Sequence, residues 1–140
     1  MTIETRTGQC LCGAVTFEAD LNGPHFHACH CAKCRRWGGG PAFATPAQAL
    51  RVTGEENVVA YSSSKHGNRH FCRQCGSHLY WSFKDGKGLA VWLGTIDDHE
   101  DMTFGSQIYI DRKPDNYGFA DRTGNLTGDQ VIALFRAGAP

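Results

Sequence analysis

Short runs in which apolar and polar residues alternate dominate the chain, and a period of two is typical of strands with one buried face. In residues 14–19, Val15 and Phe17 fall on one face. Further runs rich in β-branched and aromatic residues are predicted to be strands: 42–45, 50–53, 57–61, 78–83, 89–93 and 107–111. The pattern therefore predicts an all-β fold.

Turn-forming residues separate these runs, and helix is scarce. Asp85-Gly86 predicts a hairpin between the runs 78–83 and 89–93. One helix is predicted over residues 129–136, with Thr127 or Asp129 as its cap and Gly138 as its stop. A single helical turn is expected over residues 32–36. Because no repeat or linker divides the chain, we expect residues 1–140 to form a single domain.

The charge balance bears on the class of partner. Lysine plus arginine equals aspartate plus glutamate, at 14 each, so no strong basic field is present and we expect no nucleic-acid partner. The N-terminus lacks the apolar stretch of a signal peptide and no run is long enough to span a membrane, so we expect no membrane partner and a cytoplasmic location. In that reducing compartment, closely spaced cysteines indicate metal ligands rather than disulfides.

The seven cysteines form three clusters: Cys10-x-Cys12, Cys29-x-Cys31-x-x-Cys34 and Cys72-x-x-Cys75. Glycine follows the last cysteine of both outer clusters, whereas arginine follows the middle one. Glycine allows the chain to reverse just past a metal ligand and to turn backbone N–H groups toward sulfur. A structural zinc takes four ligands. The glycines therefore favour one closed zinc site built from the outer clusters: Cys10, Cys12, Cys72 and Cys75.

Two other arrangements of these cysteines remain open. Cys31 and Cys34 can pair with Cys72 and Cys75 in a zinc ribbon, although the gap exceeds the ~15–20 residues usual for one. That arrangement leaves the first cluster without a role. Alternatively, some of the cysteines are buried free thiols that pack as small apolar side chains.

The middle cluster can hold a second zinc by itself, which makes two zinc ions per chain. Cys29, Cys31 and Cys34 place three sulfurs around one ion and leave a position open, as in reactive zinc sites. A site of three thiolates suits a sulfur guest better than a hydrolytic water. A thiol that enters the open position becomes a thiolate at neutral pH. The predicted reaction is therefore the addition of a small thiol to an aldehyde, or its reverse.

Cationic and aromatic residues adjoin the middle cluster. Lys33, Arg35 and Arg36 can offset the negative charge of the site and attract an anionic thiol; the alternative is an ordinary solvated basic surface. Trp37, just before three glycines, is a candidate for the wall of a binding pocket. These four residues are the candidates for substrate contact.

A histidine as fourth ligand would close the middle site and remove its chemistry. His27 and His30 are the nearest candidates in the sequence. His30 lies between two cysteines, where its ring should point away from the ion, whereas His27 can lie on the same side of an extended strand as Cys29. Closure by a histidine is therefore an open alternative at this stage.

The cysteine motifs resemble those of the glutathione-dependent formaldehyde-activating enzyme family, whose domain also occurs in centromere protein V. The motifs are GQCLCGAV (8–15), CHCAKCRR (29–36) and FCRQCGSHL (71–79), and the resemblance continues through LGTIDD (93–98) and IYIDRKPD (108–115). It implies a compact tent of antiparallel sheets like that of Mss4-type proteins, built around zinc, with a structural zinc on the outer cysteines and a reactive zinc on the middle ones. It also implies formation of S-(hydroxymethyl)glutathione from formaldehyde and glutathione, the reverse of a carbon–sulfur lyase reaction.

Two functional classes follow from these observations. The first is a zinc-dependent enzyme similar to a carbon–sulfur lyase, which binds a glutathione-like thiol and promotes its addition to an aldehyde such as formaldehyde. The second is a non-catalytic zinc module that binds a thiol or a protein partner. The sequence favours the first.

Overall fold

The computed structural model describes residues 2–136, and the strands in this range form one sheet. The strand order is β10-β9-β3-β4-β8-β7-β6-β5, and β2, which pairs with β4, carries β1. The strands are β1 Glu4–Gln9, β2 Thr16–Leu21, β3 His25–Cys29, β4 Ala42–Thr53, β5 Val58–Ser62, β6 Gly67–Cys72, β7 His78–Phe83, β8 Leu89–Trp92, β9 Thr103–Ile108 and β10 Gly124–Leu126. The helices are α1 Ala32–Gly38 and α2 Gly128–Arg136, with 3-10 turns η1 Glu55–Asn57, η2 Leu93–Thr95, η3 His99–Asp101 and η4 Ile110–Arg112.

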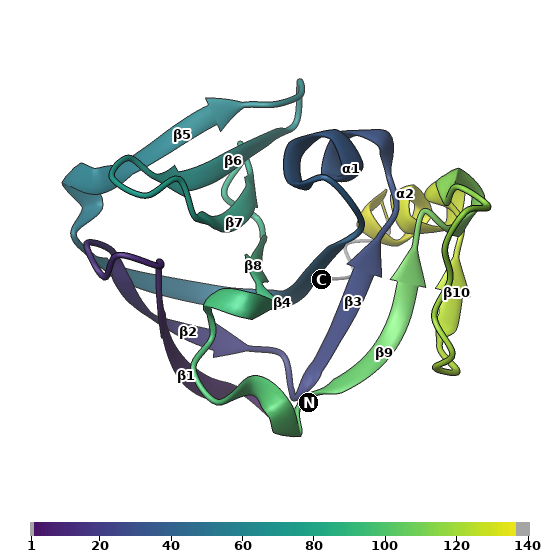
Figure 1. Ribbon diagram of the computed structural model, residues 1–140, viewed down its shortest axis with the longest axis horizontal. Coiled ribbons are helices and arrows are strands. Elements are labelled where there is room, and N and C mark those ends of the chain that lie inside the picture. The colour runs from purple at the N-terminus through teal and green to yellow at the C-terminus, as the bar shows by residue number, and fades with distance from the viewer. Residues whose placement is uncertain (1, 137–140) are drawn as a thin grey trace.

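The long strand β4 joins the parts of the sheet. It pairs with β3 through residues 42–44, with β2 through 47–53 and with β8 through 44–47. We predicted two separate strands, 42–45 and 50–53, and the structure joins them through Pro46. Proline lacks an N–H for the ladder, and the pairing with β2 shifts register close by, between Asp20 and Leu21, so the irregularity is absorbed by a bulge. Figure 1 shows β5, β6 and β7 arranged over β4, β2 and β1.

The prediction of an all-β fold is confirmed, and β7 and β8 form the predicted antiparallel hairpin. The structure adds two parallel pairings, of β9 with β3 and of β9 with β10. Strands β1, β3, β6 and β10 were not predicted, and the strand predicted over residues 107–111 is observed earlier in the chain, as β9, followed by the 3-10 turn η4. Strands β1, β6 and β10 consist mostly of polar residues and glycine, and β3 has only five residues, so their apolar alternation is too weak or too short to indicate a strand.

The main core lies against β2. Phe17, Ala19 and Leu21 are buried, whereas Thr16 and Glu18, which alternate with them, are exposed. This is the alternation of a strand with one buried face. Residues from β4, β8, η2 and the segment after it complete this core: Ala47, Val91, Leu93, Ile96 and Met102.

A second, smaller core contains Cys10, Val15, Cys72 and Leu79, all of them at most 1% exposed. It joins the turn between β1 and β2 to strands β6 and β7. Two cysteines from different clusters are therefore packed side by side in the interior.

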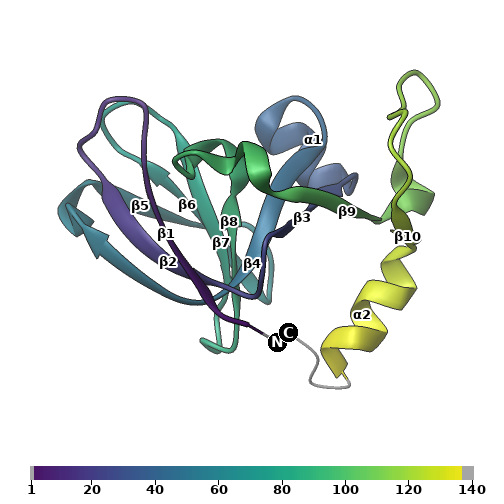
Figure 2. The same cartoon turned by 90° about the horizontal axis from the view of Figure 1, so that it is seen from below.

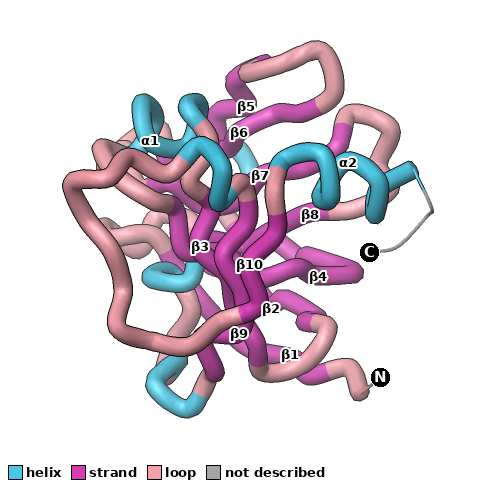
Figure 3. Tube along the Cα trace, turned by 90° about the vertical axis from the view of Figure 1, so that its right-hand side faces the viewer, coloured by secondary structure: helices cyan, strands magenta, loops and turns pink. Residues whose placement is uncertain are grey.

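Helix α2 begins one residue before its predicted start. The backbone N–H of Gln130 donates to Thr127 Oγ1 at 3.2 Å, and the N–H of Thr127 donates to Gln130 Oε1 at 2.7 Å, so Thr127 is the cap in a reciprocal capping pair. The predicted stop, Gly138, lies outside the described residues. Figures 2 and 3 show α2 following β10 at the margin of the sheet. Within residues 2–136 no helix is long and apolar enough to cross a membrane.

Candidate metal centres

The outer cysteine clusters meet although 60 residues separate them. Cys10 and Cys12 lie in the turn between β1 and β2, and Cys72 and Cys75 lie where β6 turns into β7. The Sγ atoms of Cys10 and Cys12 are 3.7 Å apart, and those of Cys12 and Cys72 are 3.8 Å apart. All four Sγ atoms lie within 4.8 Å of one another. Because Cys72 and Cys75 join the first cluster, the alternative zinc ribbon with Cys31 and Cys34 is not formed.

This spacing of sulfur atoms fits a tetrahedral zinc. A Zn–S bond of about 2.3 Å in a tetrahedron places sulfurs about 3.8 Å apart. Gly13 and Gly76 have φ of 80° and 79°, in the left-handed region expected from the sequence. A Cβ at either glycine would meet no atom within 4 Å, so backbone conformation rather than crowding accounts for glycine there.

Backbone and hydroxyl groups also point at these sulfurs. The N–H of Val15 donates to Cys10 Sγ at 3.4 Å, and that of Gln74 donates to Cys72 Sγ at 3.4 Å. Ser77 Oγ lies 3.2 Å from Cys75 Sγ and accepts from the backbone N–H of Leu11 at 3.0 Å, which links the two turns. Hydrogen bonding to the Ser77 hydroxyl, and then to its backbone, lowers the pKa of Cys75 to about 5. These hydrogen bonds therefore favour the thiolate, the form that binds metal, at Cys75, whereas the pKa of Cys12 in the same group is raised to about 11.

The middle cluster forms the second group. Cys29 ends β3, Cys31 caps α1 and Cys34 lies within α1, and their Sγ atoms are within 4.8 Å of one another. The N–H of Cys34 donates to Cys31 Sγ at 3.3 Å, as in an N-cap. Hydrogen bonds from Cys29 and then Cys34 lower the pKa of Cys31 to about 2, whereas bonds to Cys31 and Cys34 raise that of Cys29. The geometry thus gathers three buried or half-buried sulfurs, of which Cys31 most readily carries the negative charge, into a donor set that suits a divalent ion.

A buried arginine that we did not predict contacts this group. Nη1 and Nη2 of Arg69 each donate to Cys34 Sγ at 3.6 Å, and Arg69 is 5% exposed. Its side chain comes from β6, the strand whose last residue is Cys72. Within the described chain no carboxylate pairs with Arg69. The anionic partner of this cation is therefore the sulfur group itself.

Neither histidine considered as a fourth ligand joins the sulfurs, because both groups of potential ligands among the described residues consist of cysteines alone. His30 is fully buried, and its ring is held 2.8 Å from Tyr117 Oη through Nδ1 and 2.8 Å from Gln107 Oε1 through Nε2. These two contacts of His30 attach the segment between Cys29 and Cys31 to β9 and to the loop at Tyr117. Burial lowers the pKa of His27 to about 4, so the His27 ring is neutral at pH 7.

The four residues predicted to contact substrate differ in exposure and in their contacts. Lys33 and Arg36 are exposed on α1, and Arg35 is half-buried, with Nε donating to the backbone carbonyl of His30 at 2.9 Å. Trp37 is half-buried, and its ring stacks on that of His78 with centroids 4.5 Å apart. The structure thus places the cations along α1 and Trp37 at the end of the helix.

A groove of about 470 Å³ begins at Cys34. Its walls include the rings of Trp37, Phe43, His78 and Trp92, and glycine backbone forms much of the remainder. The described residues that line it include no Asp, Glu, Lys or Arg. One residue of the three-cysteine group, Cys34, therefore borders an uncharged groove rich in aromatic residues, and Trp37 is another of the residues that line it.

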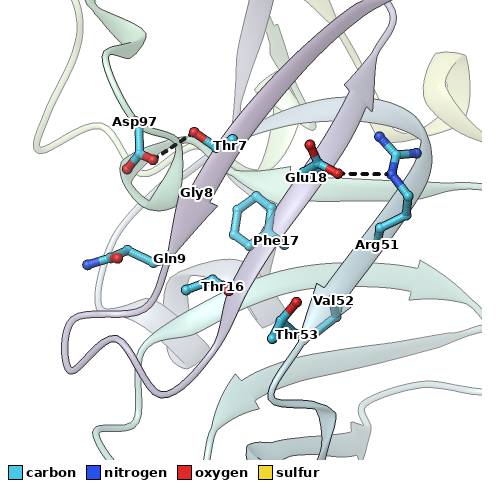
Figure 4. A pocket seen from close by; sticks show the side chains of 10 residues that line it. All are labelled: Thr7, Gly8, Gln9, Thr16, Phe17, Glu18, Arg51, Val52, Thr53 and Asp97. Carbon is cyan, nitrogen blue, oxygen red and sulfur yellow. Dashed lines mark hydrogen bonds and ion pairs between the residues drawn. The ribbon is translucent and has the colours of Figure 1, made fainter.

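A second hollow, of about 410 Å³, lies over β1, β2 and β4 and has a polar lining (Figure 4). Thr7 Oγ1 donates to Asp97 at 2.9 Å, and Arg51 Nε lies 3.4 Å from Glu18. No cysteine lines it, so it belongs to neither candidate metal centre.

Comparison with known proteins shows that the amino-acid sequence matches one family. The sequence profile of the glutathione-dependent formaldehyde-activating enzyme family matches residues 5–112. The chain is similar to an uncharacterized lyase of Schizosaccharomyces pombe, at 39% identity over 129 residues that make up 89% of this chain and 93% of the relative. It is also similar to a Halomonas elongata protein provisionally named glutathione-dependent formaldehyde-activating enzyme, at 37% identity over 86 residues, 54% of each chain.

A solved structure has a similar fold. The crystal structure of a Rhodobacter sphaeroides protein matches with a TM-score of 0.55 and 28% identity, over 70% of this chain and 98% of that protein. The resemblance stated from the cysteine motifs is confirmed by the family profile and by the similarity to the Schizosaccharomyces pombe protein.

Proposed function

Because the chain belongs to the glutathione-dependent formaldehyde-activating enzyme family, we propose that it is a zinc-dependent enzyme of the carbon–sulfur lyase type. It binds a small thiol of the glutathione kind and promotes addition of that thiol to an aldehyde such as formaldehyde, as an S-(hydroxymethyl)glutathione synthase does. Cys10, Cys12, Cys72 and Cys75 hold a structural zinc, and Cys29, Cys31 and Cys34 hold the reactive one.

The observation that carries this proposal is the composition of the second group, which has three sulfurs and no fourth ligating side chain among the described residues. A zinc ion held by Cys29, Cys31 and Cys34 would keep a position for an incoming thiol and would lower the pKa of that thiol from about 8.5, so that the thiolate would be present at neutral pH. A fourth protein ligand would remove that position. The first group, with four sulfurs, has none to offer.

The residues around the second group support binding and charge balance. Arg69 supplies one positive charge next to Cys34, which offsets the net charge of about −1 that three thiolates leave on a divalent ion. Lys33 and Arg36 on the exposed face of α1 attract the carboxylates of a thiol such as glutathione. The groove that Cys34 lines offers the aldehyde a place beside the three-cysteine group, where the small thiol binds.

The proposed step balances without an oxidant or reductant. The thiol sulfur forms a bond to the carbonyl carbon, the π electrons of the carbonyl move to its oxygen, and that oxygen takes the proton that the thiol lost. Thiol and aldehyde thus give a hydroxyalkyl thioether. Holding both reactants beside one another supplies the orientation that favours the addition.

Zinc counting with Cys34→Ser tests the division between the two groups. We expect two zinc ions in the parent and one in the variant, with the far-ultraviolet circular dichroism of the fold retained. Two-dimensional exchange NMR of glutathione and formaldehyde should show accelerated adduct formation with the parent only. A parent with one zinc would contradict the division. Two zinc ions with no acceleration would identify a non-catalytic zinc module instead.

A further inference from the structure

The groove at Cys34 is built to contact rings. Trp37 and His78, which stack on each other, stand in its wall with Phe43 and Trp92, and Phe43 is 37% exposed. Aromatic side chains bind other flat apolar groups by offset or edge-to-face packing. A groove with four ring-bearing residues beside a residue of the three-cysteine group therefore favours a flat guest.

The lining is also without charge. No acidic or basic side chain other than the imidazole of His78 and the thiol of Cys34 titrates in the described lining of the groove. Burial, followed by the nearby charge of Arg69, lowers the pKa of His78, so its ring is neutral at pH 7. A carboxylate or ammonium group would find no oppositely charged side chain in this lining. Because burial of an unpaired charge is costly, the groove disfavours charged substituents.

The groove is much larger than formaldehyde. Its volume of about 470 Å³ falls in the range of roughly 300–1,000 Å³ typical of small-molecule pockets. A water molecule takes up about 30 Å³ in the liquid, so an aldehyde of two heavy atoms fills only a small part of the space. The remaining volume accommodates a ring and a short linker.

Charge separates the two reactants. Glutathione carries two carboxylates, and the cations available to them, Lys33 and Arg36, lie on the exposed face of α1 rather than in the groove. We propose that the groove binds the flat, uncharged substituent of the aldehyde, so that aldehydes bearing an aromatic ring are substrates of this chain. This inference rests on the proposed function and names the class of aldehyde that the same site takes.

Two glycines allow the groove to be filled without disturbing the fold. A Cβ placed at Gly40 or Gly94 meets no atom within 4 Å, and neither residue has a positive φ. Both line the groove, so we expect a leucine at either position to narrow it. Gly124 is a matched control, because it is exposed on β10, does not line the groove, and its added Cβ comes no closer than 3.7 Å to another atom.

The experiment uses the full zinc-loaded chain with glutathione and two aldehydes, phenylacetaldehyde and acetaldehyde, which differ by one ring. We expect Gly94→Leu and Gly40→Leu each to lower the ratio of kcat/KM for phenylacetaldehyde over acetaldehyde about tenfold or more, the effect of losing a well-packed apolar contact. Gly124→Leu should leave the ratio as in the parent. An unreactive probe, 2-phenylethanol, should bind to the parent about tenfold more tightly than to Gly94→Leu in saturation-transfer NMR.

The outcomes separate this inference from the proposed function. Acceleration with formaldehyde and acetaldehyde but none with phenylacetaldehyde overturns the inference and leaves the proposed function standing. A ratio that stays at the parent value in both groove variants also overturns it. If no aldehyde is accelerated but 2-phenylethanol binds and Gly94→Leu weakens that binding, the groove is upheld as a site for a ring and the proposed function fails.

Discussion

Replacement of Arg69 by methionine removes the buried cation beside the three-cysteine group and keeps a side chain of similar length. Arg69 is 5% exposed, and both of its Nη atoms lie 3.6 Å from Cys34 Sγ. We expect the variant to bind zinc more weakly at the second group, because the net negative charge of three thiolates on a divalent ion would be left without compensation. The four-cysteine group should keep its zinc.

The size of the effect follows from the distance. Unit charges 3.6 Å apart attract by about 4.6 kcal/mol at an effective dielectric constant of about 20. The negative charge is shared by three sulfurs, so roughly a third to a half of this energy, about 1.5–2.5 kcal/mol, belongs to the contact with Cys34. That energy corresponds to a loss of zinc affinity of about 10- to 70-fold, within the range of roughly 10–100-fold found for groups that support metal ligands.

Chelator competition on the zinc-loaded proteins measures the second-site Kd, with the four-cysteine site as an internal reference. Arg122→Met is the matched control, because it removes the same charge from an exposed position. Arg69→Lys keeps the charge and should recover most of the zinc affinity of the second site. A general loss of packing would instead weaken zinc binding in both variants. A second-site Kd for Arg69→Met within twofold of the parent, in a folded protein, would refute the electrostatic reasoning.

Three further predictions follow from other contacts. Cys12→Ser removes a sulfur from the four-cysteine group; because a structural zinc contributes on the order of 10 kcal/mol or more, the variant should fail to fold by circular dichroism, unlike Cys34→Ser. Tyr117→Phe loses the 2.8 Å hydrogen bond to His30 and should lower the free energy of unfolding by about 1 kcal/mol in urea titrations; an unchanged midpoint would contradict a holding role for His30. Burial lowers the pKa of His78 in the folded chain, so the unfolded chain takes up its proton first, near pH 6.5. The stability contributed by His78 should then be complete above about pH 6.5 and be lost as pH falls toward the folded pKa; His78→Gln should remove that slope, and an imidazole NMR titration with a midpoint at or above 6.5 would show the sign to be wrong.

Local features of the sequence were enough to pair the outer cysteines. Gly13 and Gly76 each follow a cysteine, and a positive φ after a metal ligand depends on the turn itself rather than on distant contacts. The strand predicted over residues 14–19, observed as β2, was equally accessible, because buried Phe17 and Ala19 alternate with exposed Thr16 and Glu18. These predictions hold because the residues that determine them are neighbours in the chain.

Arg69 could not be found in this way. Strand β6, GNRHFC, lacks an apolar alternation, and only its pairing with β5 and β7 shows that Arg69 faces the interior. Its contact with Cys34 joins positions 35 residues apart. The sequence itself offers only the spacing of Gly67 and Arg69, which are two residues apart and therefore lie on the same face of a strand. A Cβ added at Gly67 would meet the Trp81 ring at 2.4 Å, so this face points inward, but that is visible only once the register of the strand is known.

Strand β6 also connects the two cysteine groups within one fold. It carries Arg69, which contacts Cys34 of the three-cysteine group, and it ends at Cys72 of the four-cysteine group. The chain that leaves the four-cysteine group then supplies Ser77 and His78 to the groove at Cys34. A metal in the first site would therefore hold the middle of the segment, at Cys72 and Cys75, whose two flanks bring a charge and a groove wall to the second site. Since supporting groups act only when held in place, loss of the first metal should weaken the second site even though no first-group sulfur belongs to it.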